Sequence, residues 1–185
     1  PLEDRVIQIS RVAGTLTYPA NLMLVATRNP CPCGNSSSLK ANCSCTVLQK
    51  IAYQKRLSGP LLDRIDIHLT VNNIKQSEML NDVQEKDSSF YLRLVMMARK
   101  IQKHRYPKHQ NITNSALLPE DILKYCQFTD TGKKFLKEIV NNNYLTMRSY
   151  YKVLKISRTI ADLAEHDMIN ESDIAEALTY RLVTL

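Results

Sequence analysis

The 185-residue sequence contains no apolar run of the about 18 residues that a membrane-spanning helix requires, and it does not open with a signal peptide. These absences exclude the transmembrane and secreted classes. Cysteine is scarce outside one cluster, which excludes a disulfide scaffold and indicates a reducing compartment; we expect a cytoplasmic location and no membrane partner. The chain also lacks an initiator methionine, so we expect a piece of a longer protein.

The overall composition is typical of a globular, basic protein, with 44% apolar residues, 23% charged residues and a net charge of +7. Residues 1–75 carry nine basic and four acidic side chains, whereas residues 110–185 carry nine and ten. Between Arg93 and His109 there are six basic residues and no acidic one. A phosphate-rich partner would suit the first hundred residues, although a solvated basic face explains the charge equally well.

The first 75 residues combine strand, loop and helix signals. Short β-prone runs flank a turn, a continuous apolar run lies between two prolines, and a later segment alternates apolar with polar residues. The predicted elements are a hairpin of 6–10 with 15–18, a buried parallel strand at 22–27, a helix at 46–57, a short helix with Pro60 at its first position, and a half-buried strand at 65–71.

After residue 75 the strand signals largely disappear and helical spacing takes over. Thr146 is an expected N-cap, and Asn170 with Asp173 resembles a capping box. The predicted helices cover 87–106, 119–126, 131–142, 147–165 and 171–181. The predicted fold class is therefore an α/β part followed by an all-α part.

Four of the five cysteines follow the pattern C-x-C-x9-C-x-C, from Cys31 and Cys33 to Cys43 and Cys45. Two thiolate pairs joined by a short loop can close a tetrahedral site, and four soft thiolates favour zinc. Such a site has no open coordination position, so the zinc would be structural; the alternative is four reduced thiols on a surface loop. The fifth, Cys126, stands alone on a predicted helix and is expected in the core.

The run Ser58-Gly59-Pro60-Leu61-Leu62-Asp63-Arg64 predicts a short helix that delivers an arginine just before a strand. A guanidinium suits the stabilisation of charge on a transferring phosphoryl group, including one bound to a neighbouring subunit. The alternative is an arginine paired with Asp63 or Asp66.

Three segments together resemble one family. They are Leu24-Val25-Ala26-Thr27-Arg28-Asn29-Pro30-Cys31-Pro32-Cys33-Gly34, the SGPLLDRIDIHL run of 58–69, and Arg158-Thr159-Ile160-Ala161-Asp162-Leu163. In this order they closely resemble the ComM/YifB family of magnesium-chelatase-like AAA+ ATPases, over essentially the whole chain. Arg5 departs from the family's usual glycine, and Thr27-Arg28 from its usual smaller or apolar residues.

The resemblance implies roles for individual residues. Asn29 matches the sensor-1 asparagine near the γ-phosphate, Arg64 the arginine finger that acts on the adjacent subunit's ATP, and Arg148 the sensor-2 arginine. Arg11, in a hairpin that matches the pre-sensor-1 insert, is the candidate for a DNA-phosphate contact. The implied domains are the C-terminal half of a P-loop core at 1–75 with the cysteine loop at 31–45, a connection with a basic helix at 76–112, and a helical lid at 113–185.

The sequence contains neither a G-x-x-x-x-G-K-[ST] loop nor a strand ending in paired acids for magnesium. We therefore expect the chain alone to be inactive, with ATP and Mg²⁺ held by upstream parts of the intact protein. The resemblance implies a homo-hexameric ring that acts on branched or single-stranded DNA as a helicase in natural transformation and recombination. Two alternatives remain: a magnesium-chelatase motor that inserts a metal into a porphyrin, and a non-catalytic zinc module that binds nucleic acid or protein.

Overall fold

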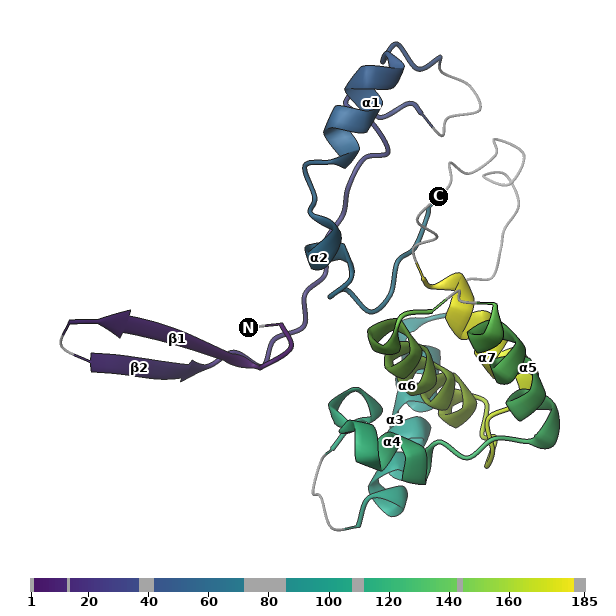
Figure 1. Ribbon diagram of the computed structural model, residues 1–185. Coiled ribbons are helices and arrows are strands. Elements are labelled where there is room, and N and C mark those ends of the chain that lie inside the picture. The colour runs from purple at the N-terminus through teal and green to yellow at the C-terminus, as the bar shows by residue number, and fades with distance from the viewer. Residues whose placement is uncertain are drawn as a thin grey trace. The chain divides into compact units, whose positions relative to one another are not determined.

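The computed structural model describes residues 2–12, 14–36, 42–71, 86–107, 112–142 and 145–181 (Figure 1). The chain divides into two compact units. The first comprises Pro1–Ile65 with Thr70–Met79, and the second comprises Asp66–Leu69 with Leu80–Leu185. No helix in the described ranges has both the length and the apolar character needed to cross a membrane.

An antiparallel hairpin opens the first unit, as the sequence predicts. Strand β1 (Val6–Arg11) pairs with β2 (Gly14–Pro19), in a register that runs from Val6 opposite Pro19 to Arg11 opposite Gly14. Gly14 has a φ of +135°, a backbone conformation that only glycine adopts readily, so the residue permits the tight reversal.

Two helices follow in the same unit, and both are capped by side chains. Helix α1 (Val47–Gln54) begins with a capping box in which Thr46 and Gln49 satisfy each other's backbone N–H groups. Helix α2 (Gly59–Leu62) is capped by Ser58 and carries proline in its first turn, so both predicted helices are confirmed.

The two strands predicted after the hairpin, at 22–27 and 65–71, are not present in the described structure. Residues 21–29 contain no strand, and Leu22, Met23 and Val25 are 56%, 88% and 82% exposed; residues 65–71 also form no strand. A strand requires a hydrogen-bonded neighbour, and among the described residues only β1 and β2 pair as strands. The α/β core implied by the family resemblance therefore stays a prediction.

The second unit is helical, and its five longer helices confirm the predicted ones. They are α3 (Ser88–Arg105), α4 (Pro119–Tyr125), α5 (Asp130–Asn141), α6 (Met147–Leu163) and α7 (Glu171–Thr179), with an unpredicted 3₁₀ turn η1 (Asn114–Ala116). Thr146 caps α6, and Asn170 with Asp173 forms the capping box of α7. Helix α6 is central and contacts α3, α4, α7 and η1.

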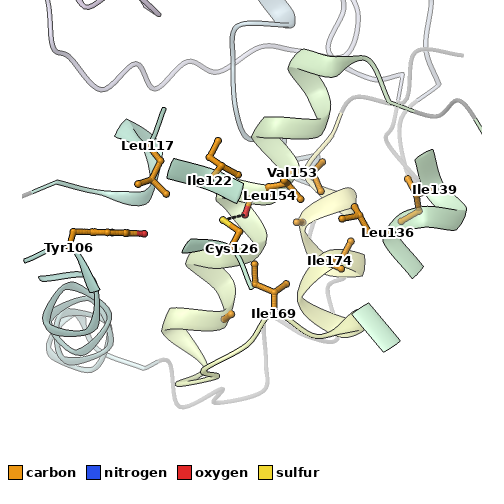
Figure 2. Close-up of a cluster of buried hydrophobic side chains, with 12 residues drawn as sticks. Tyr106, Leu117, Ile122, Cys126, Leu136, Ile139, Val153, Leu154, Ile169 and Ile174 are labelled. Atoms are coloured by element: carbon orange, nitrogen blue, oxygen red, sulfur yellow. Dashed lines mark hydrogen bonds between the residues drawn. The ribbon is translucent and has the colours of Figure 1, made fainter. Parts of the chain in front are cut away.

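The hydrophobic core of this unit lies around α6 and α7 (Figure 2). Val153, Leu154 and Ile174 are at most 1% exposed, and Cys126 is buried with its sulfur 3.9 Å from the Leu154 carbonyl oxygen. The expectation that Cys126 belongs to the core is confirmed.

A buried carboxylate joins α6 to α3 and η1. Asp162 accepts two hydrogen bonds from Arg105 (2.9 and 2.6 Å), one from Nε of Arg158 (3.0 Å) and one from Asn114 (2.8 Å). Asp162 is fully buried, and Gln102 of α3 also donates to it, at 3.3 Å. The Asp162 carboxylate thus links three segments, α3, η1 and α6. A buried charge is tolerated at this place because it is fully hydrogen-bonded.

The start of α5 is fastened to the segment that precedes α7. Phe128 and Ile169 form a parallel bridge, and the N–H groups of Thr129 and Ile169 donate to the carbonyl oxygens of Ile169 and Gln127 at 3.0 and 2.8 Å. A Cβ on Gly132 would lie 2.9 Å from the Ile169 carbonyl oxygen, closer than real Cβ atoms come. Glycine is therefore required for this approach.

Candidate functional site

The four clustered cysteines converge in the first unit. The sulfur of Cys31 lies 3.4 Å from that of Cys33 and 3.7 Å from that of Cys43, and Cys33 and Cys43 are 3.6 Å apart. All four sulfurs, including that of Cys45, lie within 4.8 Å of one another, and none is in a disulfide. Four sulfurs at the usual zinc distance of about 2.3 Å would be about 3.8 Å apart, so the donor set fits a tetrahedral metal site.

The backbone around these cysteines explains how they meet. After Cys31, the chain turns so that the N–H of Gly34 donates to the Cys31 carbonyl at 3.0 Å, and Gly34 adopts a φ of +79°. At the other end, Cys45 directly precedes Thr46, the N-cap of α1. The cysteine loop therefore leads into the first turn of a well-capped helix.

The thiols are electrostatically unequal. A hydrogen bond from the backbone of Asn35, helped by Cys31, lowers the pKa of Cys33 to about 5. At Cys45 a backbone hydrogen bond from Cys33 favours the thiolate, but desolvation and the neighbouring sulfurs outweigh it and raise the pKa to about 11. Cys33 consequently carries negative charge, the form that binds metals, more readily than Cys45 does.

An open hollow of about 660 Å³ lies between the cysteine loop and one face of α1. Tyr53 is part of its lining, and the guanidinium carbons of Arg28 and Arg56 lie 5.2 and 5.9 Å from the centre of the Tyr53 ring. Both distances fall within cation–π range. The hollow is lined by Pro32, Cys33, Ser44, Cys45, Gln49, Ala52, Tyr53 and Arg56.

The sequence analysis named Arg28 only as a departure from the family pattern, and it assigned no role to Tyr53 or Arg56. A partial signal was present, because Gln49, Ala52, Tyr53 and Arg56 have the i, i+3, i+4, i+7 spacing of one helix face. Arg28 gives no such signal, because its approach to Tyr53 depends on how the cysteine loop folds back.

The structure places Asn29 and Arg64 in the first unit. Asn29 ends the exposed extended segment, and its side-chain nitrogen lies 3.9 Å from the position that a Cβ on Gly34 would take. Arg64 follows α2, donates to the Pro60 carbonyl oxygen at 2.9 Å and pairs with Glu3 at 3.4 Å, with 39% of its side chain exposed. The contacts with Pro60 and Glu3 thus hold the Arg64 guanidinium in place while the side chain remains partly exposed.

Arg148 and Arg11 lie on other elements. Arg148 occupies the first turn of α6 in the second unit, next to Ser149, whose N–H donates to the N-cap hydroxyl of Thr146 at 3.2 Å. Arg11 is the last residue of β1 and is exposed at the tip of the hairpin. Of the sequence-predicted site residues, the four cysteines are the ones that the structure brings into one cluster.

Two family models match the chain: magnesium chelatase subunit ChlI over residues 1–79 and its C-terminal region over residues 85–181. The chain is 36% identical to competence protein ComM of Haemophilus influenzae over 98% of its own length, and 32% identical to the uncharacterized protein YifB of Escherichia coli over 99%. An uncharacterized protein of Mycobacterium tuberculosis is 29% identical over 98%. In each case the chain spans 35% of the relative's length. The resemblance drawn from the sequence is confirmed, and the chain belongs to the magnesium chelatase subunit ChlI family, among relatives that include ComM and YifB.

Proposed function

We propose that this chain is the C-terminal portion of a cytoplasmic, ring-forming AAA+ ATPase that remodels DNA, as a helicase or branch-migration motor in natural transformation. The likeness to a competence protein over nearly the whole chain carries this proposal. The basic first part of the chain supports it, because a phosphate backbone is the partner that such a surface attracts.

The exposed apolar segment before Asn29 supports an ATPase core that is larger than this chain. Leu22, Met23, Leu24 and Val25 would bury their side chains if residues 22–27 became a central strand of a sheet completed by the rest of the protein. In such a sheet Asn29 would follow the carboxyl end of the strand, where nucleotides bind in open α/β folds.

Three residues then act in ATP hydrolysis. Asn29 positions the attacking water, Arg148 contacts the nucleotide of its own subunit, and Arg64 stabilises charge on the phosphoryl group held by the adjacent subunit of a hexamer. The accessible guanidinium of Arg64, anchored through Pro60 and Glu3, supports this role. The phosphate cradle and the Mg²⁺ ligands come from residues outside this chain.

ATP hydrolysis by the full-length protein, with and without branched DNA, tests the function. We expect DNA to stimulate turnover, Arg64→Ala to abolish turnover while leaving nucleotide binding in place, and Lys133→Ala, at an exposed lysine of α5, to behave as wild type. Loss of nucleotide binding in assembled Arg64→Ala rings would refute the action on a neighbouring subunit.

A magnesium-chelatase motor is the second candidate, because the matching family models describe that enzyme's subunit. The likeness to a competence protein over 98% of the chain favours the DNA motor over this candidate. ATP turnover that is indifferent to DNA would favour the chelatase, and absence of turnover under every condition would favour a non-catalytic binding module.

We also propose that Cys31, Cys33, Cys43 and Cys45 hold a structural Zn²⁺, because their sulfur separations match a ZnS₄ tetrahedron. The bound metal would order the loop, which has little apolar content of its own. Elemental analysis should find about one zinc per chain, retained in Cys126→Ser and lost in Cys43→Ser. A wild-type chain without metal after metal-sparing purification would refute the site.

A further inference from the structure

The stretch between Asp4 and Asp63 is free of acidic residues. None of these 58 residues is aspartate or glutamate, while the same stretch contains seven lysines and arginines. The positive charge is therefore not neutralised locally, and it includes the cysteine loop and all of α1. The basic residues are Arg5, Arg11, Arg28, Lys40, Lys50, Lys55 and Arg56.

Within this stretch, one aromatic ring organises two of the arginines. Arg28 reaches Tyr53 from the segment before the cysteine loop, and Arg56 reaches it from just beyond the end of α1. Contact with a ring face leaves the edge of a guanidinium, with its five N–H donors, free to bind phosphate oxygens. Both Arg28 and Arg56 are exposed, and neither is seen in an ion pair with another described residue, whereas Arg64 pairs with Glu3.

The hollow beside the ring has a mixed lining. Pro32 and Ala52 offer apolar surface, and Gln49 and Ser44 offer hydrogen-bonding groups in the same lining as Arg56. Arg28 reaches the hollow's edge through its contact with the Tyr53 ring. An unpaired base can pack against such a surface while its phosphates meet the guanidiniums, whereas the bases of a duplex are stacked inside and cannot enter. The arrangement thus suits a single strand.

We propose that Arg28, Arg56 and Tyr53 form a binding surface for the phosphate backbone of single-stranded DNA, with an unpaired base in the adjoining hollow. The inference rests on the proposed function and deepens it, because it assigns a contact surface to the DNA outside the hairpin of Arg11. Tyr53 acts as a positioning residue, because its ring contacts both guanidiniums. The four-cysteine loop, which forms one wall of the hollow, fixes the wall's geometry.

The test is binding of a fluorescent 30-nucleotide oligo(dT) to the full-length protein, measured by anisotropy between 50 and 200 mM salt. Removing two phosphate contacts from a single-strand site lowers the slope of log affinity against log salt by about 1.4. For Arg28→Gln/Arg56→Gln we therefore expect an affinity about tenfold weaker than that of wild type at 200 mM salt. The loss of affinity between 50 and 200 mM salt should be about sevenfold smaller for this variant than for wild type. Lys133→Gln/Lys137→Gln, which removes two exposed charges from α5, is the matched control and should keep the wild-type slope.

Further variants separate the role of the Tyr53 aromatic ring from that of the arginine charges. Tyr53→Leu should weaken binding with little change in slope, and Tyr53→Phe should restore it, because the phenyl ring keeps the cation–π contacts. Unchanged zinc content and circular dichroism establish that each variant is folded.

Each outcome bears on one claim. A double variant that matches its control in affinity and slope overturns this surface while leaving the DNA motor intact. Wild-type protein that binds no oligonucleotide overturns the proposed function itself. An equal loss of affinity for an unbranched duplex overturns the assignment to single strands, and loss of an acidic protein partner alone would reassign the surface to protein.

Discussion

Replacing Asp162 with asparagine is the sharpest test of how the helical unit is held together. The change keeps the side-chain size but leaves the guanidiniums of Arg105 and Arg158 without their counter-charge. Breaking a buried ion pair by removing one partner costs about 3–5 kcal/mol. Arg158 is 1% exposed and cannot recover water, whereas Arg105 is 17% exposed and recovers some, so we expect a loss of about 3–4 kcal/mol.

Urea denaturation of the 185-residue chain, followed by circular dichroism at 222 nm, measures this loss. With a slope of about 2 kcal/mol per molar urea, the midpoint of the helical unit should fall by about 1.5–2 M. Glu138→Gln, which removes an exposed charge from α5, should leave the midpoint within about 0.3 M. A loss below about 1 kcal/mol for Asp162→Asn would show that the network adds little stability, and the reasoning would fail.

Two further predictions concern the same unit. Desolvation by burial raises the pKa of Cys126 from 9.0 to about 11. Because the folded state favours the neutral thiol, the free energy of unfolding is unaffected by this group below pH 9 and falls as the pH rises toward 11, by about 3 kcal/mol in total. Urea midpoints from pH 8 to 11 should fall more steeply for wild type than for Cys126→Ala, and parallel curves would contradict the prediction. Thr146→Ala removes the N-cap of α6, whose hydroxyl accepts from Ser149 at 3.2 Å, and should cost about 1 kcal/mol in the same assay, whereas Thr146→Ser should restore most of it.

The helices were predictable because their signals are local. Thr146, and the pair Asn170 and Asp173, mark helix starts through side chains within three residues of the groups they bind. The apolar run at 22–27 carries an equally clear local signal, yet it forms no strand in the described structure. Pairing depends on a neighbouring strand elsewhere in the chain, and no run of six residues contains that information.

The cysteine cluster was predictable for a similar reason, since spacing alone limits how far two C-x-C pairs can separate. The network around Asp162 was not, because Arg105 and Asn114 are 57 and 48 residues away from it. A partial signal existed: Arg158 and Asp162 stand one turn apart on a helix whose buried residues also include Val153, Leu154 and Ala161. Buried charges at that spacing are uncommon and indicate a third partner.

Gly132 has a consequence for anyone who engineers this chain or compares it with others. Because the main chain of Ile169 occupies the space where a side chain would begin, even alanine there must push α5 away from the segment before α7. A related sequence that carries a larger residue at the equivalent position must therefore place its fifth helix farther from, or at a different angle to, the segment before α7. For a reporter or cross-linker on α5, the exposed side chains of Lys133 and Lys137 are the suitable attachment points, since they leave this contact intact.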